Sequence, residues 1–373
     1  AAPSTARAMD KENFMASSAL PLVFISGYSP ATQPGIYGCR FDPTTGALTA
    51  IGSFSGIVNP SYLAVHPTGH WLYAVSETSL ASDGRLGSVW ALRFEPEPFT
   101  LLPINHQPTQ GEVPCHLQLD ATGRWLLVSN YGTGNVGVLP IQPDGALGEM
   151  TDLVQHRGHG PSAERQAAPH AHSATVTPDN RFVIVADLGI DQLVVYQFDA
   201  AAGRLRPHTS VNTRPGAGPR HLAFHPSGRQ VYVANELDST VVVYDYEAVS
   251  GALHERQVLS TLPPGAPENI VADIHVSPDG GHVYVSNRGH NSLAVFRIGA
   301  EGRLTPLAIQ PCGGNWPRNF TLAPNGRFIL VANQYSDEVS VLPVPQGTAV
   351  LGAPVSRLTV SQASCIQWVP DDD

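Results

Sequence analysis

The residues of this chain whose side chains are best suited to catalysis carry an imidazole, a carboxylate or a guanidinium group: His172, Glu236, Arg220, Arg288 and Arg318. An imidazole or a carboxylate can take a proton from water or from a carbon acid, and guanidinium groups bind carboxylates and phosphates through paired hydrogen bonds. They also stabilise a developing oxyanion. We therefore predict acid–base chemistry on an anionic substrate at a site that these five residues form together. Glu236 and His172 are both candidates for the base.

A repeated pattern relates these residues to one another. Its clearest copy, residues 219–236, reads PRHLAFHPSGRQVYVANE, which is a short strand, a tight turn, a second strand and a polar end. Similar segments recur about every 50 residues, the length of a four-stranded propeller blade. The seven copies begin at Pro60, Pro114, Ala171, Pro219, Val271, Pro317 and Ala363.

The repeat predicts an all-β fold, a seven-bladed β-propeller of four-stranded antiparallel blades, as a single domain over residues 21–370. The strand at 22–26 has no inner strand before it, whereas the last copy of the repeat has no second strand after it. We expect these N- and C-terminal strands to pair and close the ring, which removes exposed sheet edges. Residues 1–20 show no periodicity, and we interpret them as a flexible leader or a non-native extension.

The predicted active-site residues lie at two places in the repeat, the start of the first strand and the end of the second. Because these strands are antiparallel, both places should face the same mouth of the central channel. Insertions at 78–88 and 156–170 should form loops at one end of the disc, where long loops often shape a binding site. The asparagines that recur at the second place are better explained by capping of the strand ends: Asn130, Asn235, Asn287 and Asn333.

Further residues at or beside these places are predicted to bind the substrate. They are charged, polar or aromatic: Arg318, His116, His221, Asn319, Trp316 and Glu77. Trp316 could stack on a ring substrate or belong to the core. The PHAHS segment (169–173) offers two histidines, but additional ligands are not evident at matching positions, so we expect no metal and no cofactor.

The composition argues against several other classes of function. The net charge of −10 provides no basic footprint for nucleic acid, and no apolar run is long enough to span a membrane. The sequence contains no GxSxG, P-loop or HExxH motif. The four scattered cysteines favour buried free thiols and a cytoplasmic location: Cys39, Cys115, Cys312 and Cys365. A periplasmic location is the alternative if a signal peptide was removed before Ala1.

Several motifs resemble the seven-bladed propeller lactonase family, which includes bacterial 6-phosphogluconolactonases and fungal carboxy-cis,cis-muconate lactonizing enzymes. The motifs are PHAHS around His172, GPRHLAFHPSG around Arg220, VANELDSTV around Glu236, SNRGHNS around Arg288 and NWPRNFTLAPNGRFILVANQ around Arg318. The resemblance covers residues 21–370, and both activities share these motifs. It implies an active-site set of one His, two Arg and one Glu, which falls on His172, Arg220, Glu236 and Arg288.

The residues and the resemblance together lead us to expect a metal-independent lactone hydrolase that acts on a sugar lactone such as 6-phospho-D-glucono-1,5-lactone. A Glu or His base would activate water, and arginines would bind the anionic group and the oxyanion. A muconate lactonizing enzyme (a cycloisomerase) is one alternative, and a non-catalytic binding platform is an alternative of another class. We expect a small-molecule anionic lactone as partner, no nucleic acid or membrane partner, and a monomer or homodimer.

Overall fold

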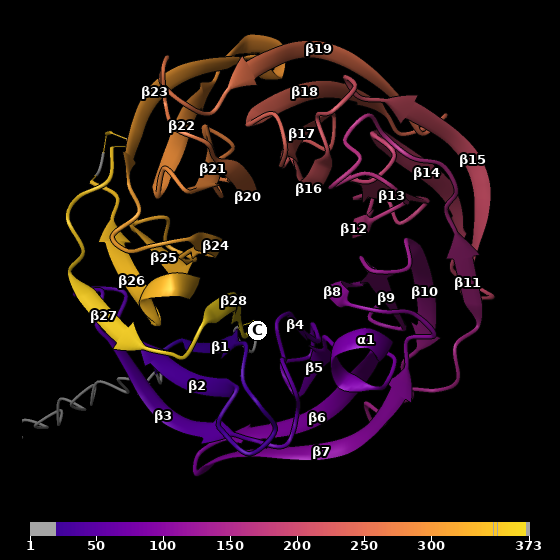
Figure 1. The fold of residues 1–373 in the computed structure, drawn as a ribbon. Coiled ribbons are helices and arrows are strands. Elements are labelled where there is room, and N and C mark those ends of the chain that lie inside the picture. The colour runs from indigo at the N-terminus through magenta and orange to yellow at the C-terminus, as the bar shows by residue number, and fades with distance from the viewer. Residues whose placement is uncertain (1–19, 346, 349, 371–373) are drawn as a thin grey trace, which may run out of the picture.

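The computed structural model describes residues 20–345, 347–348 and 350–370 of the chain. Across these residues the strands form seven four-stranded antiparallel sheets, which are arranged as a ring of blades (Figure 1). The prediction of an all-β, seven-bladed propeller is therefore confirmed. The predicted leader lies outside the described residues, apart from Leu20 at its end.

Each blade runs from an innermost strand near the ring centre to an outer edge strand. From the inside outward, the blades are β28 (Ala363–Trp368), β1 (Leu22–Gly27), β2 (Ile36–Phe41) and β3 (Leu48–Phe54); β4 (Leu63–Val65), β5 (Trp71–Ser76), β6 (Ser88–Pro96) and β7 (Phe99–Pro108); β8 (Pro114–Leu119), β9 (Trp125–Asn130), β10 (Asn135–Pro140) and β11 (Asp152–Gln155); β12 (Ala171–Val176), β13 (Phe182–Asp187), β14 (Gln192–Asp199) and β15 (Arg204–Asn212); β16 (Pro219–Phe224), β17 (Gln230–Asn235), β18 (Thr240–Glu247) and β19 (Ala252–Ser260); β20 (Ile270–Val276), β21 (His282–Arg288), β22 (Ser292–Ile298) and β23 (Leu304–Pro311); β24 (Pro317–Leu322), β25 (Phe328–Asn333), β26 (Glu338–Pro343) and β27 (Ser356–Thr359).

The ring is closed by strands from opposite ends of the chain. β28 pairs antiparallel with β1, and Phe24 lies opposite Gln367. Figure 1 shows the yellow β28 beside the indigo β1 in one blade. The predicted pairing of the N- and C-terminal strands is confirmed, and it leaves neither strand as an open edge.

The hydrophobic core lies between neighbouring blades. In the described residues, seven clusters of buried side chains each join two adjacent blades. One of them packs Tyr232 and Val243 against Val271 and Phe296 of the next blade. The Tyr232 hydroxyl also donates to the carbonyl oxygen of Gly302 at 3.0 Å. Close packing of this kind resists deformation, so it fixes where the strand ends meet at the ring centre.

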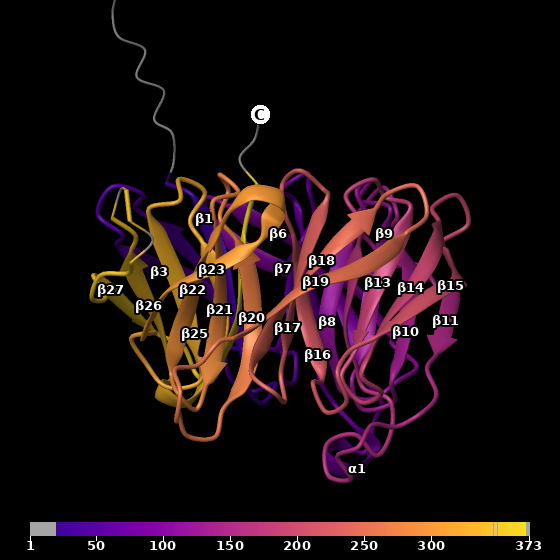
Figure 2. The same cartoon turned by 90° about the horizontal axis from the view of Figure 1, so that it is seen from above.

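The two predicted insertions follow strands that end at the same face of the disc. Residues 78–88 contain one helical turn, α1 (Leu80–Asp83), which is capped by the Ser79 side chain. α1 projects from that face in Figure 2. Residues 156–170 run from β11 to β12 without helix or strand. The short 3-10 turns are η1 (Ala300–Gly302) and η2 (Gln334–Ser336). None of the described helices has the length and hydrophobicity that crossing a bilayer requires.

The cysteines and the recurring asparagines behave as predicted. All four cysteines are buried free thiols. Asn130 Nδ2 donates to the Thr109 carbonyl oxygen at 3.2 Å, and Asn287 Nδ2 donates to that of Thr261 at 3.0 Å. The other two asparagines donate to hydroxyl groups of the adjacent third strand. These contacts stay within the fold and explain why the asparagines recur.

Candidate active site

The innermost strands carry a β-bulge where they begin, and several predicted site residues occupy it. The pairing of β16 with β17 jumps from Pro219 to His221 and leaves out Arg220. The same shift leaves out His172 in β12 and Arg318 in β24. A bulged residue stands outside the hydrogen-bond ladder, so its side chain can be directed differently from those of regular strand residues. The repeat of this irregularity from blade to blade helps to bring these side chains together at one mouth.

Glu236 is the centre of the charged cluster at this mouth. It directly follows β17, and its Oε2 accepts hydrogen bonds from Arg220 Nε at 3.0 Å and from Arg288 Nη2 at 2.7 Å. Its Oε1 accepts a hydrogen bond from Arg165 Nη2. The Glu236 side chain is 4% exposed. Three cations therefore surround one almost completely buried carboxylate.

The arginines decide the protonation state of Glu236. Burial alone would raise the pKa of Glu236, but the charges of Arg288, Arg220 and Arg165 outweigh burial and lower it to about 2. The carboxylate is therefore ionised throughout the neutral range, and it is a weak proton acceptor there. Both of its oxygens accept hydrogen bonds from arginines.

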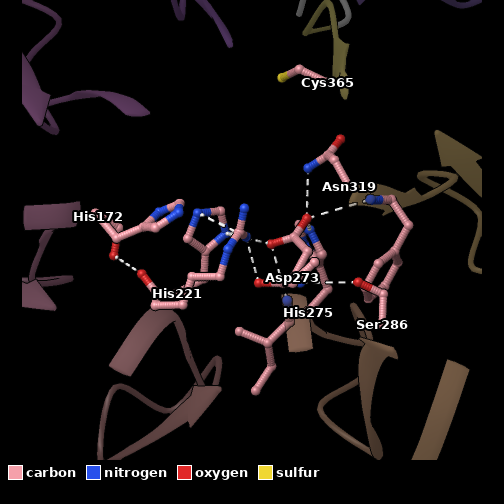
Figure 3. Close-up of polar contacts among 12 residues, drawn as sticks. His172, His221, Asp273, His275, Ser286, Asn319 and Cys365 are labelled. Atoms are coloured by element: carbon pink, nitrogen blue, oxygen red, sulfur yellow. Dashed lines mark hydrogen bonds and ion pairs between the residues drawn. The ribbon is translucent and has the colours of Figure 1, made fainter. Parts of the chain in front are cut away.

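His172 lies beside this cluster with a neutral ring. Burial, followed by the charge of Arg220, holds the pKa of His172 well below the usual 6.5. Its Nδ1 is 3.8 Å from Cys115 Sγ, and burial raises the pKa of that thiol to about 12. Its ring packs edge-on against His221, with centroids 5.2 Å apart (Figure 3). A neutral imidazole in this position can accept a proton at neutral pH.

A second polar group lies further along the inner strands and is centred on Asp273 (Figure 3). Asp273 Oδ1 is 2.8 Å from His221 Nδ1, and Oδ2 is 3.0 Å from His275 Nε2. Asn319 Nδ2 donates to Asp273 Oδ2 at 2.6 Å, and Asn319 Oδ1 accepts from the Ile366 amide at 2.8 Å. A hydrogen-bonded chain therefore links β16, β20, β24 and β28 around the ring centre.

Three residues predicted to bind substrate belong to this inner group or pack on it. His221 and Asn319 are bound to Asp273, and the His116 ring packs against His221 with centroids 5.4 Å apart. Burial, then Arg220, lowers the pKa of His221 to about 4. Burial, then His221, holds the pKa of His116 well below 6.5. These side chains lie deeper in the central channel than the residues of the mouth and pack against them.

A small cavity separates the mouth from the inner group. Its volume is about 10 Å³, and it is lined by Ser61, Tyr62, Cys115, Arg220, His221, Arg318, Asn319 and Ser364. A cavity of this size has room for about one water molecule. A sugar-sized ring does not fit in this cavity.

Glu77 and Arg318 form another part of the mouth together with Tyr28. The Tyr28 hydroxyl donates to Glu77 Oε2 at 2.9 Å, and the Ser61 hydroxyl donates to the same oxygen. The Arg318 guanidinium lies over the Tyr28 ring, 5.3 Å from its centroid, as in a cation–π contact. Tyr28 follows β1 as Glu236 follows β17, so the closing blade also contributes its strand end to the mouth.

Trp316 lies beside Arg288. Its half-buried ring stacks on Tyr335, with centroids 4.7 Å apart and planes 22° apart. The Arg288 guanidinium is 5.7 Å from the centroid of the Trp316 ring. These contacts place Trp316 next to a predicted catalytic residue, and stacking of its ring on a substrate stays a prediction.

Two charged residues of the site were not found from the sequence. Arg165 lies in the insertion 156–170, which was predicted to be a mouth loop without any single residue being selected. Asp273 lies in β20, where the irregular pairing between Val271 and Ile274 leaves out Ala272 and Asp273 on one strand and Ser286 on the other. It occupies the repeat position of His221 and Asn319, and the signal that could have found it was a carboxylate at that position. For Arg165 the signal was only a charged side chain in a loop, whose geometry the repeat does not specify.

The two PHAHS histidines do not converge on a common point. His170 Nδ1 is 2.8 Å from the Tyr131 carbonyl oxygen, and its ring stacks on that of Tyr131 with centroids 4.3 Å apart. His172 contacts Cys115 instead. Within the described part of the chain, no group of three or more His, Cys, Asp or Glu side chains is arranged to hold a metal ion.

The fold and the mouth define a class of protein, a seven-bladed propeller whose buried arginines and neutral histidine suit an anionic substrate. The family model for "Lactonase, 7-bladed beta-propeller" matches residues 22–368. The chain therefore belongs to the seven-bladed β-propeller lactonase family, and it is a lactonase, a hydrolase of cyclic esters. The resemblance indicated by its motifs is confirmed.

Named relatives cover almost the whole chain. It is 34% identical over 348 residues to a 6-phosphogluconolactonase of Bacillus subtilis, which covers 93% of this chain and 97% of that protein. A 6-phosphogluconolactonase of Formosa agariphila is 30% identical and covers 89% of this chain and 95% of its own length. Among solved structures, the periplasmic gluconolactonase of Pseudomonas aeruginosa superposes with a TM-score of 0.89 at 31% identity, over 94% of this chain and 99% of that one.

Proposed function

We propose that this lactonase hydrolyses a negatively charged sugar lactone such as 6-phospho-D-glucono-1,5-lactone. The observation that carries the proposal is the Glu236 carboxylate surrounded by Arg165, Arg220 and Arg288, with the neutral ring of His172 beside them. The names of the relatives support a gluconolactone ring, with phosphate in two of them and without it in the third.

His172 is the proposed general base. Its neutral ring takes a proton from a water molecule while the water oxygen attacks the lactone carbonyl carbon. The carbonyl oxygen receives the π electrons and becomes an oxyanion. When the intermediate collapses, the bond from the carbonyl carbon to the ring oxygen breaks, and His172 returns the proton to that oxygen. The product is an open-chain hydroxy acid, and His172 is neutral again.

Arg220 and Arg288 are the proposed oxyanion donors. Besides Glu236, Arg220 binds the carbonyl oxygen of Ala272, and Arg288 binds that of Val271 at 2.9 Å. These bonds fix both guanidinium groups before substrate arrives, which is the condition for efficient electrostatic stabilisation. Arg288 Nε is buried and lacks a hydrogen-bond partner among the described residues. An unpaired donor on a buried charge is costly to stability.

Glu236 is the proposed positioning residue for these arginines. A carboxylate with a pKa of about 2 is a weak base at neutral pH, and its oxygens already accept hydrogen bonds from three arginines. Its charge keeps Arg220 and Arg288 close together despite their mutual repulsion. In this proposal His172 is the base, and Glu236 holds the arginines in position.

A hydrolysis panel tests the proposal. The purified chain is assayed at neutral pH with 6-phosphogluconolactone, gluconolactone, galactonolactone and a muconolactone, with and without a chelator. We expect acid release from a gluconolactone that is unaffected by the chelator and is lost in His172→Gln. Turnover of the muconolactone alone would instead identify a cycloisomerase, and no turnover of any lactone would leave a binding platform. Loss of activity with the chelator would overturn metal independence.

Location and assembly stay predictions. The Pseudomonas relative is described as periplasmic, so the cytoplasmic location expected for this chain is checked by fractionating cells that express the full-length gene. A monomer or homodimer is checked by light scattering of the purified chain.

A further inference from the structure

Arg165 reaches the mouth from a loop that is anchored in the fold. The next residue, Gln166, is fully buried, and its Nε2 donates to the Leu188 carbonyl oxygen at 2.8 Å and to Asp191 Oδ1 at 2.7 Å. The Arg165 amide donates to Ser162 Oγ at 3.2 Å. These bonds hold the loop against the turn between β13 and β14. Hydrogen bonds therefore hold Arg165 in a defined position at the mouth, although its loop has no regular secondary structure.

Arg165 differs from the other two arginines on Glu236 in exposure and direction. Its side chain is 33% exposed, whereas those of Arg220 and Arg288 are 3% and 4% exposed. Arg165 donates to Glu236 Oε1, and the two buried arginines donate to Oε2. A substrate whose reacting carbonyl lies against the buried arginines therefore has its solvent-side end next to Arg165.

The mouth holds more positive than negative charge. Four arginines lie there: Arg165, Arg220, Arg288 and Arg318. The carboxylates with the largest effects on the buried arginines are Glu236 and Glu77, with Asp273 further in, so four arginines face these three carboxylates. The chain as a whole carries a net charge of −10. A neutral lactone would leave this local excess uncompensated, whereas a phosphate monoester brings about 1.5 to 2 negative charges at pH 7.

We propose that Arg165 selects a phosphorylated lactone by binding its phosphate, while Arg220 and Arg288 act on the carbonyl. This inference rests on the lactone hydrolysis proposed above. In a 6-phospho-1,5-lactone, the ring oxygen and two carbons connect the reacting carbonyl carbon to the phosphate ester oxygen. One small molecule therefore presents its carbonyl inward and its phosphate outward. Guanidinium groups bind phosphate through two parallel hydrogen bonds, which a lysine cannot reproduce.

The competing explanation is that Arg165 only neutralises Glu236. In that case its loss would disturb Arg220 and Arg288 indirectly and would affect phosphorylated and unphosphorylated substrates alike. The two explanations differ in substrate selectivity, which is the quantity to measure.

The test compares three variants of the full chain. R165Q removes the charge, and R165K keeps the charge without the paired donors. R157Q is the matched control, because Arg157 lies on the same loop, is exposed, and removes the same charge when changed. For each variant, kcat and KM are measured for 6-phosphogluconolactone and for gluconolactone. Binding of the products 6-phosphogluconate and gluconate is measured by calorimetry.

We expect R165Q to lower kcat/KM for the phosphorylated lactone by about 30-fold, mainly through KM, and to change that for gluconolactone less than about 3-fold. R165K should fall between R165Q and the unmodified chain, and R157Q should match the unmodified chain. An equal loss on both substrates, or no loss on either, would overturn the inference while leaving lactone hydrolysis intact.

Calorimetry separates this inference from the proposed function. If the unmodified chain turns over neither lactone, hydrolysis fails, and product binding alone decides the role of Arg165. A weakening of 6-phosphogluconate binding by about 30-fold in R165Q but not in R157Q then supports a phosphate site. Equal binding of 6-phosphogluconate by all variants overturns it.

Discussion

Arg165 and Glu236 are 71 positions apart in the sequence, and their side chains form an ion pair at the rim of the mouth. The same carboxylate binds Arg220 and Arg288, which come from two adjacent blades. Glu236 therefore joins a loop and two inner strands through one group. Glu236, one of the two candidates for the base, is therefore the centre of an arginine cluster.

Replacing Glu236 with Gln should reduce stability as well as activity. The change keeps the shape of the side chain but leaves Arg220 and Arg288 buried without a counter-charge, and breaking a buried ion pair costs about 3–5 kcal/mol. Urea denaturation measures this cost, and E247Q, at the exposed Glu247, is the control. If Glu236 positions arginines, the residual activity keeps an acid limb, at the same pH or lower, because the loss of a negative charge disfavours protonation of His172. Loss of the acid limb in E236Q would instead identify Glu236 as the base.

The pH profile should report His172. The reaction needs the neutral ring, and the pKa of His172 is held well below 6.5 by burial and by nearby arginines. We therefore expect kcat/KM to stay level as the pH falls from 7.5 past 6.5, and to decline only at lower pH. Removing one of these charges in R318Q should raise the pKa and move the acid limb upward by up to about one pH unit. An acid limb at or above 6.5 in the unmodified chain would contradict a buried, arginine-flanked base.

The fold and the buried half of the site could be predicted because both are properties of the repeat. Copies that begin at equivalent residues must form equivalent strands, so the spacing of Arg220 and Glu236 within one copy places both at one end of a blade. The closing pair β28–β1 followed from incomplete copies at the two ends. Tyr28 directly follows β1, the second strand of the closing blade, so the repeat specifies its position as well.

The remaining part of the site depends on departures from the repeat. The insertion 156–170 contains two arginines, and nothing in its sequence distinguishes Arg165, which binds Glu236, from the exposed Arg157. The distinction comes from the burial of Gln166, which is a tertiary contact. Asp273, by contrast, occupies the same repeat position as His221 and Asn319, so its place at the ring centre follows from the repeat, and only its hydrogen-bond partners do not.

Buried neutral histidines should make the protein sensitive to mild acid. The pKa of His221 is lowered to about 4, so the unfolded chain takes up its proton first as the pH falls below 6.5. Stability should be constant above about pH 6.5 and should fall towards pH 4, at up to about 1.4 kcal/mol per pH unit for each such histidine. His116 and His172 act in the same direction. Thermal denaturation at several pH values measures the slope.

A matched pair of variants tests whether His221 causes this pH dependence of stability. H221N should reduce the proton uptake on unfolding between pH 6.5 and 4 by about one, whereas His254→Asn should leave it unchanged because His254 is exposed. Identical slopes in H221N and the unmodified chain would show that other groups cause the acid sensitivity.

Asp273 offers a test of whether the inner polar group serves stability or chemistry. The Asp273 carboxylate accepts a hydrogen bond from Asn319 and pairs with His221 and His275. Asn319 in turn accepts a hydrogen bond from the backbone amide of Ile366. D273N places an amide donor among these donors, so we expect a loss of about 3 kcal/mol in the free energy of unfolding. E301Q, at the exposed Glu301 of the same blade, is the control for charge. Because a sugar-sized ring does not fit in the small cavity, the KM of folded D273N should change less than about 3-fold. A large rise in KM at unchanged stability would mean that substrate reaches past Arg220 and contacts the inner group directly.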